Sequence, residues 1–279
     1  MQNIKSESKI AWKLFKDILM LPVNLLLLVF GKKSISDVLR PVSDIFRFIF
    51  EAKVTIWLVI LNIIIYFGVT FLLITGIIEE SFIDLYFIGT TRGFLNLDFP
   101  PLIGSWFFHA SVFHLFGNML FLFILGRVVE KELGGPKTLL IYFGAAIIST
   151  VADNLVHIFI IPIKDYAVVG ASGAISGLGG AALLLSPFYL TYLVVGIPLP
   201  IIFVVLLQIY TDITGVLNPT SNIGHIAHLT GYLSVAITMF LLSKNDRNKM
   251  KKGLFICIIT VIASILVFIF ANRFIGLQI

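Results

Sequence analysis

Charged residues are scarce in this chain of 279 residues. Asp, Glu, Lys and Arg together make up 13% of it, whereas hydrophobic residues make up 58% and the mean hydropathy is +1.04. A soluble domain carries about 25% charged residues, which cover its surface. The deficit therefore excludes a protein whose surface mainly contacts water and indicates that lipid is its main solvent.

Charge is absent altogether from two long stretches, 54–76 and 253–271. Each is long enough to cross the hydrocarbon core of a membrane, which takes about 20 apolar residues in an α-helix. Because backbone groups cannot be left unpaired in lipid, spanning segments are either helices or closed barrels. Continuous apolar runs lack the alternation of barrel strands, so the sequence predicts an all-α polytopic membrane protein.

Cysteine is nearly absent as well. The single Cys257 lies in the middle of an apolar run, where it has no disulfide partner within the chain and no activating base near it in sequence. We expect it to face lipid or to fill space in the core, rather than to be a catalytic thiol. The N-terminal segment lacks the cleavage site of a secretory signal peptide. The net charge of +5 does not indicate nucleic-acid binding, because the basic residues cluster beside apolar segments.

Turn residues divide the chain into seven expected transmembrane helices. Gly, Pro and Asn interrupt the apolar pattern at several points, such as Gly134-Gly135-Pro136 and Asn218-Pro219. We expect helices at 54–77, 103–126, 137–160, 171–187, 189–210, 223–243 and 253–271. The first six occupy 54–243 and form one expected unit, which the N-terminal segment 1–53 precedes. The segment 244–279 contains a basic loop and the seventh helix.

Basic residues are distributed unevenly between the loops. Nine lie in 1–53, three in 127–137 and five in 244–252, whereas the alternate loops carry few. The positive-inside rule then places the N-terminus in the cytoplasm and the alternate loops, one of which contains Asp212, outside. The apolar run 19–30 is too short for an eighth span, so we expect 1–53 to be cytoplasmic or interfacial. Ile and Lys content favours a prokaryotic plasma membrane.

Polar side chains, which are costly in lipid, gather in three of these helices. They are His109, His114 and Asn118 in the second, Gly170-Ala171-Ser172-Gly173 at the start of the fourth, and His225 and His228 at the start of the sixth. Under the expected topology all three groups lie toward the external side. A serine and a histidine at matched depth can form a nucleophile–base pair, and we predict that Ser172 and His228 do so.

The neighbouring residues have the chemistry that such a pair needs. His114 and Asn118 are four residues apart and share one face of a helix, so together with the backbone N–H of Ser172 they could donate to an oxyanion. Small residues recur at intervals of three or four: Gly170, Gly173, Gly177 and Gly180, with Gly231 three residues after His228. Such a stripe lets helices approach closely, which would bring Ser172 to His228.

Other polar residues have plainer interpretations. We expect His109 to be structural, His225 to lie at the rim of the site and His157 to be interfacial. A pair of histidines such as His225 and His228 can bind a metal, but no HExxH motif or carboxylate ligand accompanies them in sequence. The sequence therefore predicts neither a metal nor a cofactor.

Taken together, these motifs resemble the rhomboid family of intramembrane serine proteases. His109-x4-His114-x3-Asn118 is similar to its second-helix motif, Gly170-Ala171-Ser172-Gly173 to its GxSG nucleophile motif, and Ala227-His228-Leu229-Thr230-Gly231 to its catalytic-histidine motif. Leu125-Gly126-Arg127…Glu130…Leu133-Gly134 resembles the segment after the second helix. The resemblance covers about 54–243 and implies a Ser172–His228 dyad without an acidic member. It also implies an oxyanion site at His114 and Asn118, and single-span membrane proteins as substrates.

Two positions depart from the family pattern. Pro100 and Pro101 stand where rhomboids often carry Trp-Arg, and Ser176 stands where many carry an aromatic residue that packs on the catalytic imidazole. Candidates to orient His228 instead are Tyr210, Tyr232 and Trp106. Two other functions stay open: a rhomboid-like protein that binds membrane clients without cutting them, and a transporter that relays protons through residues such as Asp153 and His157.

Overall fold

The computed structural model describes residues 12–161, 166–191, 199–216, 218, 221 and 223–275. Seven apolar helices dominate this part of the chain: α4 (Lys53–Ile74), α8 (Val112–Leu133), α9 (Gly135–Phe159), α10 (Ser172–Leu185), α11 (Ile201–Val216), α12 (His225–Thr238) and α13 (Lys244–Ile275). Four of them, α4, α8, α9 and α13, are long and apolar enough to cross a membrane, and the other three are shorter apolar helices. The prediction of an all-α polytopic membrane protein is confirmed.

Helix α10 lies at the centre of the bundle, where it contacts α8, α9, α11, α12 and α13. Its small side chains make this possible, because a Cβ at Gly177 would lie 2.2 Å from Cβ of Ala145 in α9. Likewise, a Cβ at Gly180 would lie 2.8 Å from the carbonyl oxygen of Tyr232 in α12. Small residues at such crossings let helices pack closely where lipid supplies no hydrophobic driving force between them.

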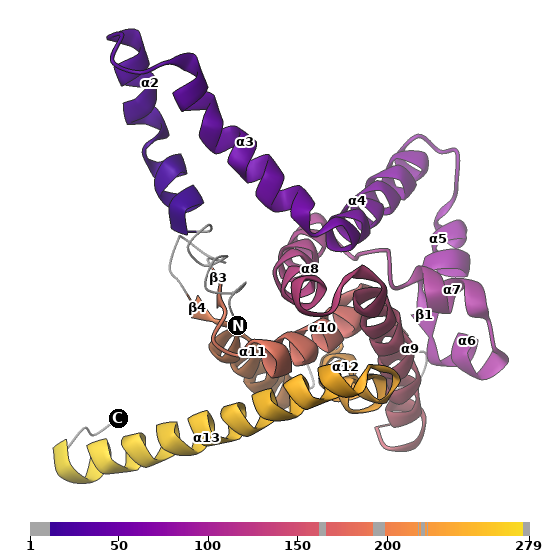
Figure 1. Cartoon of the computed structure of the whole chain (residues 1–279). Coiled ribbons are helices and arrows are strands. Elements are labelled where there is room, and N and C mark those ends of the chain that lie inside the picture. Colours follow the sequence, from indigo (N-terminus) through magenta and orange to yellow (C-terminus); the bar gives the residue numbers. More distant parts are fainter. Residues whose placement is uncertain are drawn as a thin grey trace.

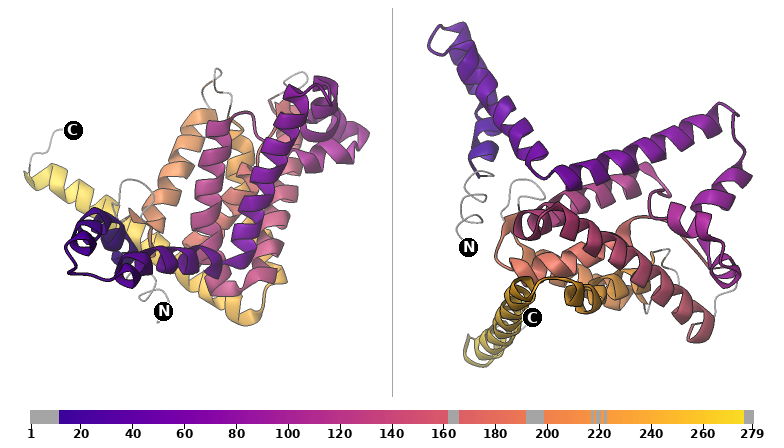
Figure 2. Two further views of the ribbon diagram at one scale, coloured as in Figure 1. Left: turned by 90° about the horizontal axis from the view of Figure 1, so that it is seen from above. Right: turned by 45° about the vertical axis from the view of Figure 1, so that its right-hand side comes forward.

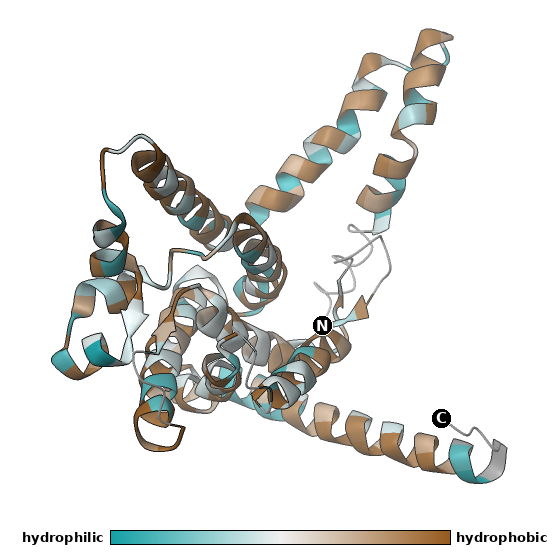
Figure 3. Cartoon of the chain, turned by 180° about the vertical axis from the view of Figure 1, so that it is seen from behind, coloured by the Kyte–Doolittle hydropathy of each residue, from teal (hydrophilic) through white to brown (hydrophobic). Residues whose placement is uncertain are grey.

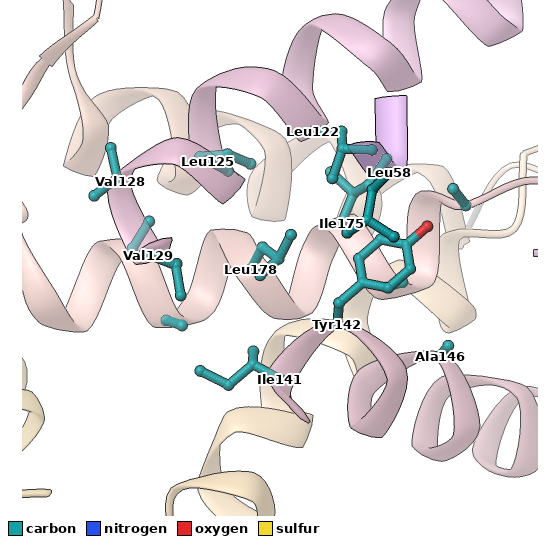
Figure 4. Packing of buried hydrophobic residues seen from close by; sticks show 14 of the residues in the cluster. Leu58, Leu122, Leu125, Val128, Val129, Ile141, Tyr142, Ala146, Ile175 and Leu178 are labelled. Atoms are coloured by element: carbon teal, nitrogen blue, oxygen red, sulfur yellow. The ribbon is translucent and has the colours of Figure 1, made fainter. Parts of the chain in front are cut away.

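Apolar side chains from α4, α8, α9 and α10 form the core of the bundle. Leu122 and Leu125 of α8, Tyr142 of α9 and Leu178 of α10 are almost fully buried and meet there (Figure 4). The core therefore fixes α10 against α8, which carries His114 and Asn118.

The segment between α4 and α8 folds as short elements along one side of the bundle (Figure 1). These are α5 (Glu80–Phe87), β1 (Gly89–Thr90), α6 (Thr91–Asn96) and α7 (Phe99–Gly104). Strand β1 pairs in antiparallel fashion with β2 (Ala167–Val168), which immediately precedes the GxSG motif. The backbone N–H of Gly170 also donates to the carbonyl oxygen of Ser105 at 2.7 Å. These hydrogen bonds thus fix the position of the residues that lead into α10.

Pro100 and Pro101 have a structural role in this segment. Both lie in the first turn of α7, where a missing backbone N–H costs no intrahelical hydrogen bond. Pro101 and Leu102 are buried, and α7 packs closely on α5, since a Cβ at Gly104 would lie 1.9 Å from the carbonyl oxygen of Tyr86. Burial of α7 therefore contributes to anchoring the segment that lacks the Trp-Arg pair.

At the opposite end of α8, charged side chains join the bundle to α3 (Ile35–Glu51), which follows α2 (Leu21–Val29) in the chain. The carboxylate of Glu130 accepts from the backbone N–H groups of Val54 and Thr55 at 3.0 and 2.8 Å, so it caps the start of α4. The buried Arg127 pairs with Glu51 at 2.8 Å and lies over the ring of Phe48. The charged residues after the second-helix motif are thus structural.

Two parts extend away from the bundle, namely the α2–α3 hairpin and the C-terminal half of α13 (Figures 1 and 2). Helix α13 crosses α10 at Gly253, where a Cβ would lie 1.7 Å from the carbonyl oxygen of Leu184. Cys257, one turn further on, is still buried, but residues 261–270 are exposed all round the helix. This part of α13 is apolar, as is much of α4 (Figure 3). Such faces suit contact with lipid.

Three of the expected spans are shifted in the structure. The seventh, expected at 253–271, starts at Lys244, so the predicted basic loop at 244–252 is the first part of α13. The second begins at Val112 instead of 103, because the side chain of Ser111 caps the helix by accepting from the N–H of His114 at 3.1 Å. It continues to Leu133 through the predicted loop at 127–137, since Arg127 and Glu130 find partners. The expected fifth span at 189–210 is wrong by a similar amount. Strand β3 (Leu190–Thr191) pairs with β4 (Leu199–Pro200), and α11 starts only at Ile201.

Candidate active site

A cavity of about 930 Å³ lies among α8, α10, α11 and α12. Its lining includes His114 and Asn118 from α8, Ser172 from α10 and His228 from α12. The four residues that the sequence singles out for catalysis therefore share one cavity, although they come from three helices.

Ser172 is the first residue of α10 and follows a sharply turned backbone. Gly170 has a φ of 124°, a left-handed value that favours glycine. Ala171, at the N-cap, supplies no side-chain hydrogen bond to the first turn. The first N–H groups of an α-helix have no partner within the helix, so the backbone at Ser172 has donors available beside its hydroxyl.

His114 and Asn118 lie directly against this turn. A Cβ at Gly170 would be 3.1 Å from Nε2 of His114 and 3.6 Å from Nδ2 of Asn118. The backbone N–H of Ala110 donates to Nδ1 of His114 at 3.4 Å, which leaves Nε2 to carry the ring proton. Nδ2 of Asn118 is buried and has no hydrogen-bond partner within the described residues. Two side-chain donors are thus placed beside the turn that leads to Ser172.

His228 contacts an acidic residue that sequence reasoning missed. Its Nδ1 lies 2.8 Å from Oδ1 of Asp212, and Nδ1 of His225 lies 2.8 Å from the same oxygen. On the other side of its ring, Nε2 of His225 is 2.8 Å from Oγ of Ser221. We call these four residues, Ser221, Asp212, His225 and His228, the Asp212 network.

The expectation that Asp212 lies in a loop is wrong, because the later start of α11 places it inside that helix, where it is 5% exposed. The sequence does contain a signal for it. Asp212 is the only charged residue between Asp165 and Lys244, and a charge within an apolar helix indicates a functional site.

A family model described as "Rhomboid domain" matches residues 98–245, more than half of the chain. The chain belongs to the rhomboid family. It is 29% identical over 199 residues to "Rhomboid-like protein 11, chloroplastic" of Arabidopsis thaliana, covering 67% of this chain and 65% of that protein. It is 35% identical over 100 residues to "Putative rhomboid protease YdcA" of Bacillus subtilis (strain 168), covering 36% of this chain and 48% of that protein. The matches therefore span between about half and just under two thirds of these relatives.

The three side chains proposed above to steady the imidazole in this rhomboid have other partners or are exposed. Trp106 donates from Nε1 to Oγ1 of Thr150 at 2.9 Å, and Tyr232 donates from its hydroxyl to Oε1 of Gln208 at 3.3 Å. Tyr210 is 64% exposed. The imidazole of His228 is hydrogen-bonded instead to Asp212 on α11.

The rhomboid's α10 and α12 approach each other most closely next to the site. A Cβ at Gly231 would lie 2.3 Å from the carbonyl oxygen of Gly173 and 2.9 Å from Cβ of Ser176. Gly173 follows Ser172 directly, and Gly231 lies one turn after His228. The glycine-to-glycine contact therefore holds the turns that carry Ser172 and His228 close together.

The remaining histidines of the rhomboid have separate environments. His109 is 1% exposed and meets the ring of His114 edge-on. His157, which we expected at the interface, is buried at the end of α9, where Nδ1 lies 2.9 Å from the carbonyl oxygen of Asp153. Its ring stacks on Tyr166. Burial and the nearby Asp153 carboxylate raise the pKa of the Tyr166 hydroxyl, which lies in the wall of the cavity.

The Asp212 network also offers a set of ligand atoms for a metal ion. One atom each from Asp212, His225 and His228 lies within 4.8 Å of the others. A carboxylate and two imidazoles are a ligand set that Zn²⁺ accepts. The carboxylate whose absence from the sequence motif argued against a metal is thus supplied by a different helix.

Proposed function

We propose that this rhomboid is an intramembrane serine endopeptidase. Ser172 attacks the scissile carbonyl while Nε2 of His228 takes its proton, and His228 then returns the proton to the leaving amine. Water hydrolyses the resulting acyl-enzyme by the same steps in reverse order. The shared cavity of Ser172 and His228 supports this assignment.

The observation that carries the proposal is the unpaired Nδ2 of Asn118. A buried donor without a partner costs about 1–3 kcal/mol, and such groups are rare in folded proteins. This one lies in the cavity beside the turn that leads to Ser172. The negatively charged oxygen of a tetrahedral intermediate would accept from this Nδ2 group. Nε2–H of His114 and the backbone N–H of Ser172 would donate to the same oxygen.

The substrates that we propose are single-span membrane proteins, cut within or near the bilayer. A carbonyl in a helix is already hydrogen-bonded and surrounded by side chains, so the substrate must enter as a locally unwound segment. Apolar residues such as Phe113, Phe121 and Ile175 line the cavity beside the polar ones. They suit an apolar segment that leaves lipid.

The test is cleavage of a generic single-span substrate by the detergent-solubilised full chain. We expect wild type to cut it and to be labelled at Ser172 by a fluorophosphonate, and we expect Ser172→Ala and His228→Ala to do neither. Ser176→Ala is the matched control, since it removes a hydroxyl one turn further along α10. Cleavage that survives Ser172→Ala would refute the serine mechanism. Absence of both cleavage and labelling in wild type would favour a rhomboid that binds clients without cutting them.

A further inference from the structure

The Asp212 network is unusual in its setting, because α11 has a mainly apolar sequence and carries no other charged residue. An isolated carboxylate there would be costly unless it were paired and hydrogen-bonded. Asp212 is 5% exposed, and one of its oxygens lies 2.8 Å from Nδ1 of both His225 and His228. The pairing therefore accounts for how this helix tolerates the charge.

The hydrogen bonds of the network determine which ring nitrogens carry protons. A carboxylate only accepts, so the Nδ1 atoms of His225 and His228 must both donate to it. In a neutral imidazole the other nitrogen is then an acceptor. For His225 that atom accepts from the hydroxyl of Ser221 at 2.8 Å. For His228 the acceptor is Nε2, on the side of the ring away from Asp212.

This is the tautomer that a general base needs. His228 and Ser172 line the same cavity, and a base can take the hydroxyl proton only through an unprotonated nitrogen. A carboxylate on Nδ1 also stabilises the imidazolium that forms when Nε2 accepts that proton. His225, whose Nε2 accepts from Ser221, donates to the same carboxylate oxygen.

We propose that Asp212 is the positioning residue of His228, so that this rhomboid works through a serine–histidine–aspartate triad rather than a dyad. The inference rests on the proposed function. The bond between Ser172 Oγ and the substrate carbonyl forms as the proton moves from Oγ to Nε2 of His228. Asp212 stays ionised throughout and receives no proton.

The test compares Asp212→Asn with Thr214→Val, an exposed substitution half a turn further along α11. Asn keeps the size of the side chain but removes the charge and can offer its own N–H to Nδ1, which imposes the wrong tautomer. We expect kcat for the single-span substrate to fall by at least about 100-fold with KM changed less than about threefold, by analogy with the loss of a triad aspartate. Thr214→Val should leave both constants unchanged.

Two further measurements separate positioning from folding. The thermal unfolding temperature of the detergent-solubilised variants identifies any loss of structure, and Asp212→Glu should recover part of kcat if the carboxylate is what matters. A kcat of Asp212→Asn within threefold of wild type in a folded protein would overturn the proposal. The proposal would also be overturned if the activity of Asp212→Asn fell only in proportion to the amount of folded protein.

The proposal is also testable if the chain proves to cut nothing. The Nδ1 proton between His228 and a carboxylate should give a low-field proton resonance in wild type that is lost in Asp212→Asn and in His228→Ala, but kept in Ser172→Ala. Absence of that resonance from the folded wild type would overturn the assigned geometry. Its presence in a protein without protease activity would refute the proposed function and leave the pairing in place.

Discussion

Replacing Gly231 by alanine tests whether the contact between α10 and α12 sets the distance from Ser172 to His228. The added Cβ would lie 2.3 Å from the carbonyl oxygen of Gly173. An ordinary non-bonded contact takes about 3.5 Å, so α12 has to move away from α10 by about 1 Å. Because Gly231 is one turn from His228, the imidazole moves with it.

The size of the effect follows from the geometry of proton transfer. A general base works at about 2.6–3.2 Å from the atom that gives up the proton. A displacement of about 1 Å is larger than the width of this range, and misplacements of that size cost about 100-fold in rate, or about 2.7 kcal/mol in the activation barrier. Overpacking also destabilises the fold, by about 1–3 kcal/mol.

The assay is the initial rate of cleavage of a single-span substrate, with the rate of fluorophosphonate labelling at Ser172 as a measure that needs no peptide. Gly68→Ala in α4 is the matched control, because a Cβ there would have nothing within 4 Å. We expect Gly231→Ala to fall about 100-fold below this control in both assays. If the folded Gly231→Ala protein stays within threefold of Gly68→Ala, the close approach of α10 and α12 does not set the catalytic distance.

Three other predictions follow from the site and from its support. Asn118→Ala should lower kcat by about 100-fold with KM nearly unchanged, as for the loss of an oxyanion donor; kcat within threefold of wild type would contradict this role. Zn²⁺ should inhibit cleavage by occupying the Asp212 network, chelation should reverse it, and Asp212→Asn should be less sensitive; equal sensitivity would point to another site. Although partial burial acts to raise the pKa of Glu51, hydrogen bonds from Lys131 and Arg127 lower it overall. Its pairing therefore stabilises the fold above about pH 4.3, the ordinary pKa of Glu, and is lost as the pH falls through the lowered value. Glu51 is 47% exposed, so Glu51→Gln should cost less than about 1 kcal/mol at pH 7; a difference in unfolding temperature that persists at pH 3 would contradict the sign.

The sequence predicts the seven apolar helices because the cost of unpaired backbone groups in lipid leaves few alternatives. It also predicts which polar residues gather, since each is expensive in an apolar helix unless it has a function. Ser172, His114, Asn118 and His228 do line one cavity. Whether they catalyse peptide hydrolysis stays a prediction.

The sequence predicts the ends of the helices less accurately than the helices themselves, for a physical reason. Hydropathy counts Phe107 and Phe108 as apolar whether or not they are helical, and it cannot detect that the Ser111 hydroxyl caps α8. It also treats Arg127 as a loop residue, although pairing with Glu51 lets it stay in the helix. Pairing between residues far apart in the chain, as in β1 with β2, is invisible to a local pattern.

Ser176 and Asp212 provide two parts of one solution to the orientation of His228. A small residue at 176 lets Gly231 come close, since a Cβ at Gly231 would already be 2.9 Å from Cβ of Ser176. A small side chain there cannot pack on the imidazole as an aromatic ring would, so the ring has to be held from another side. Asp212 does this from α11, through Nδ1. Orientation of the proposed base then depends on where α11 lies, and any movement of α11 away from α12 would remove the carboxylate from His228 without disturbing Ser172.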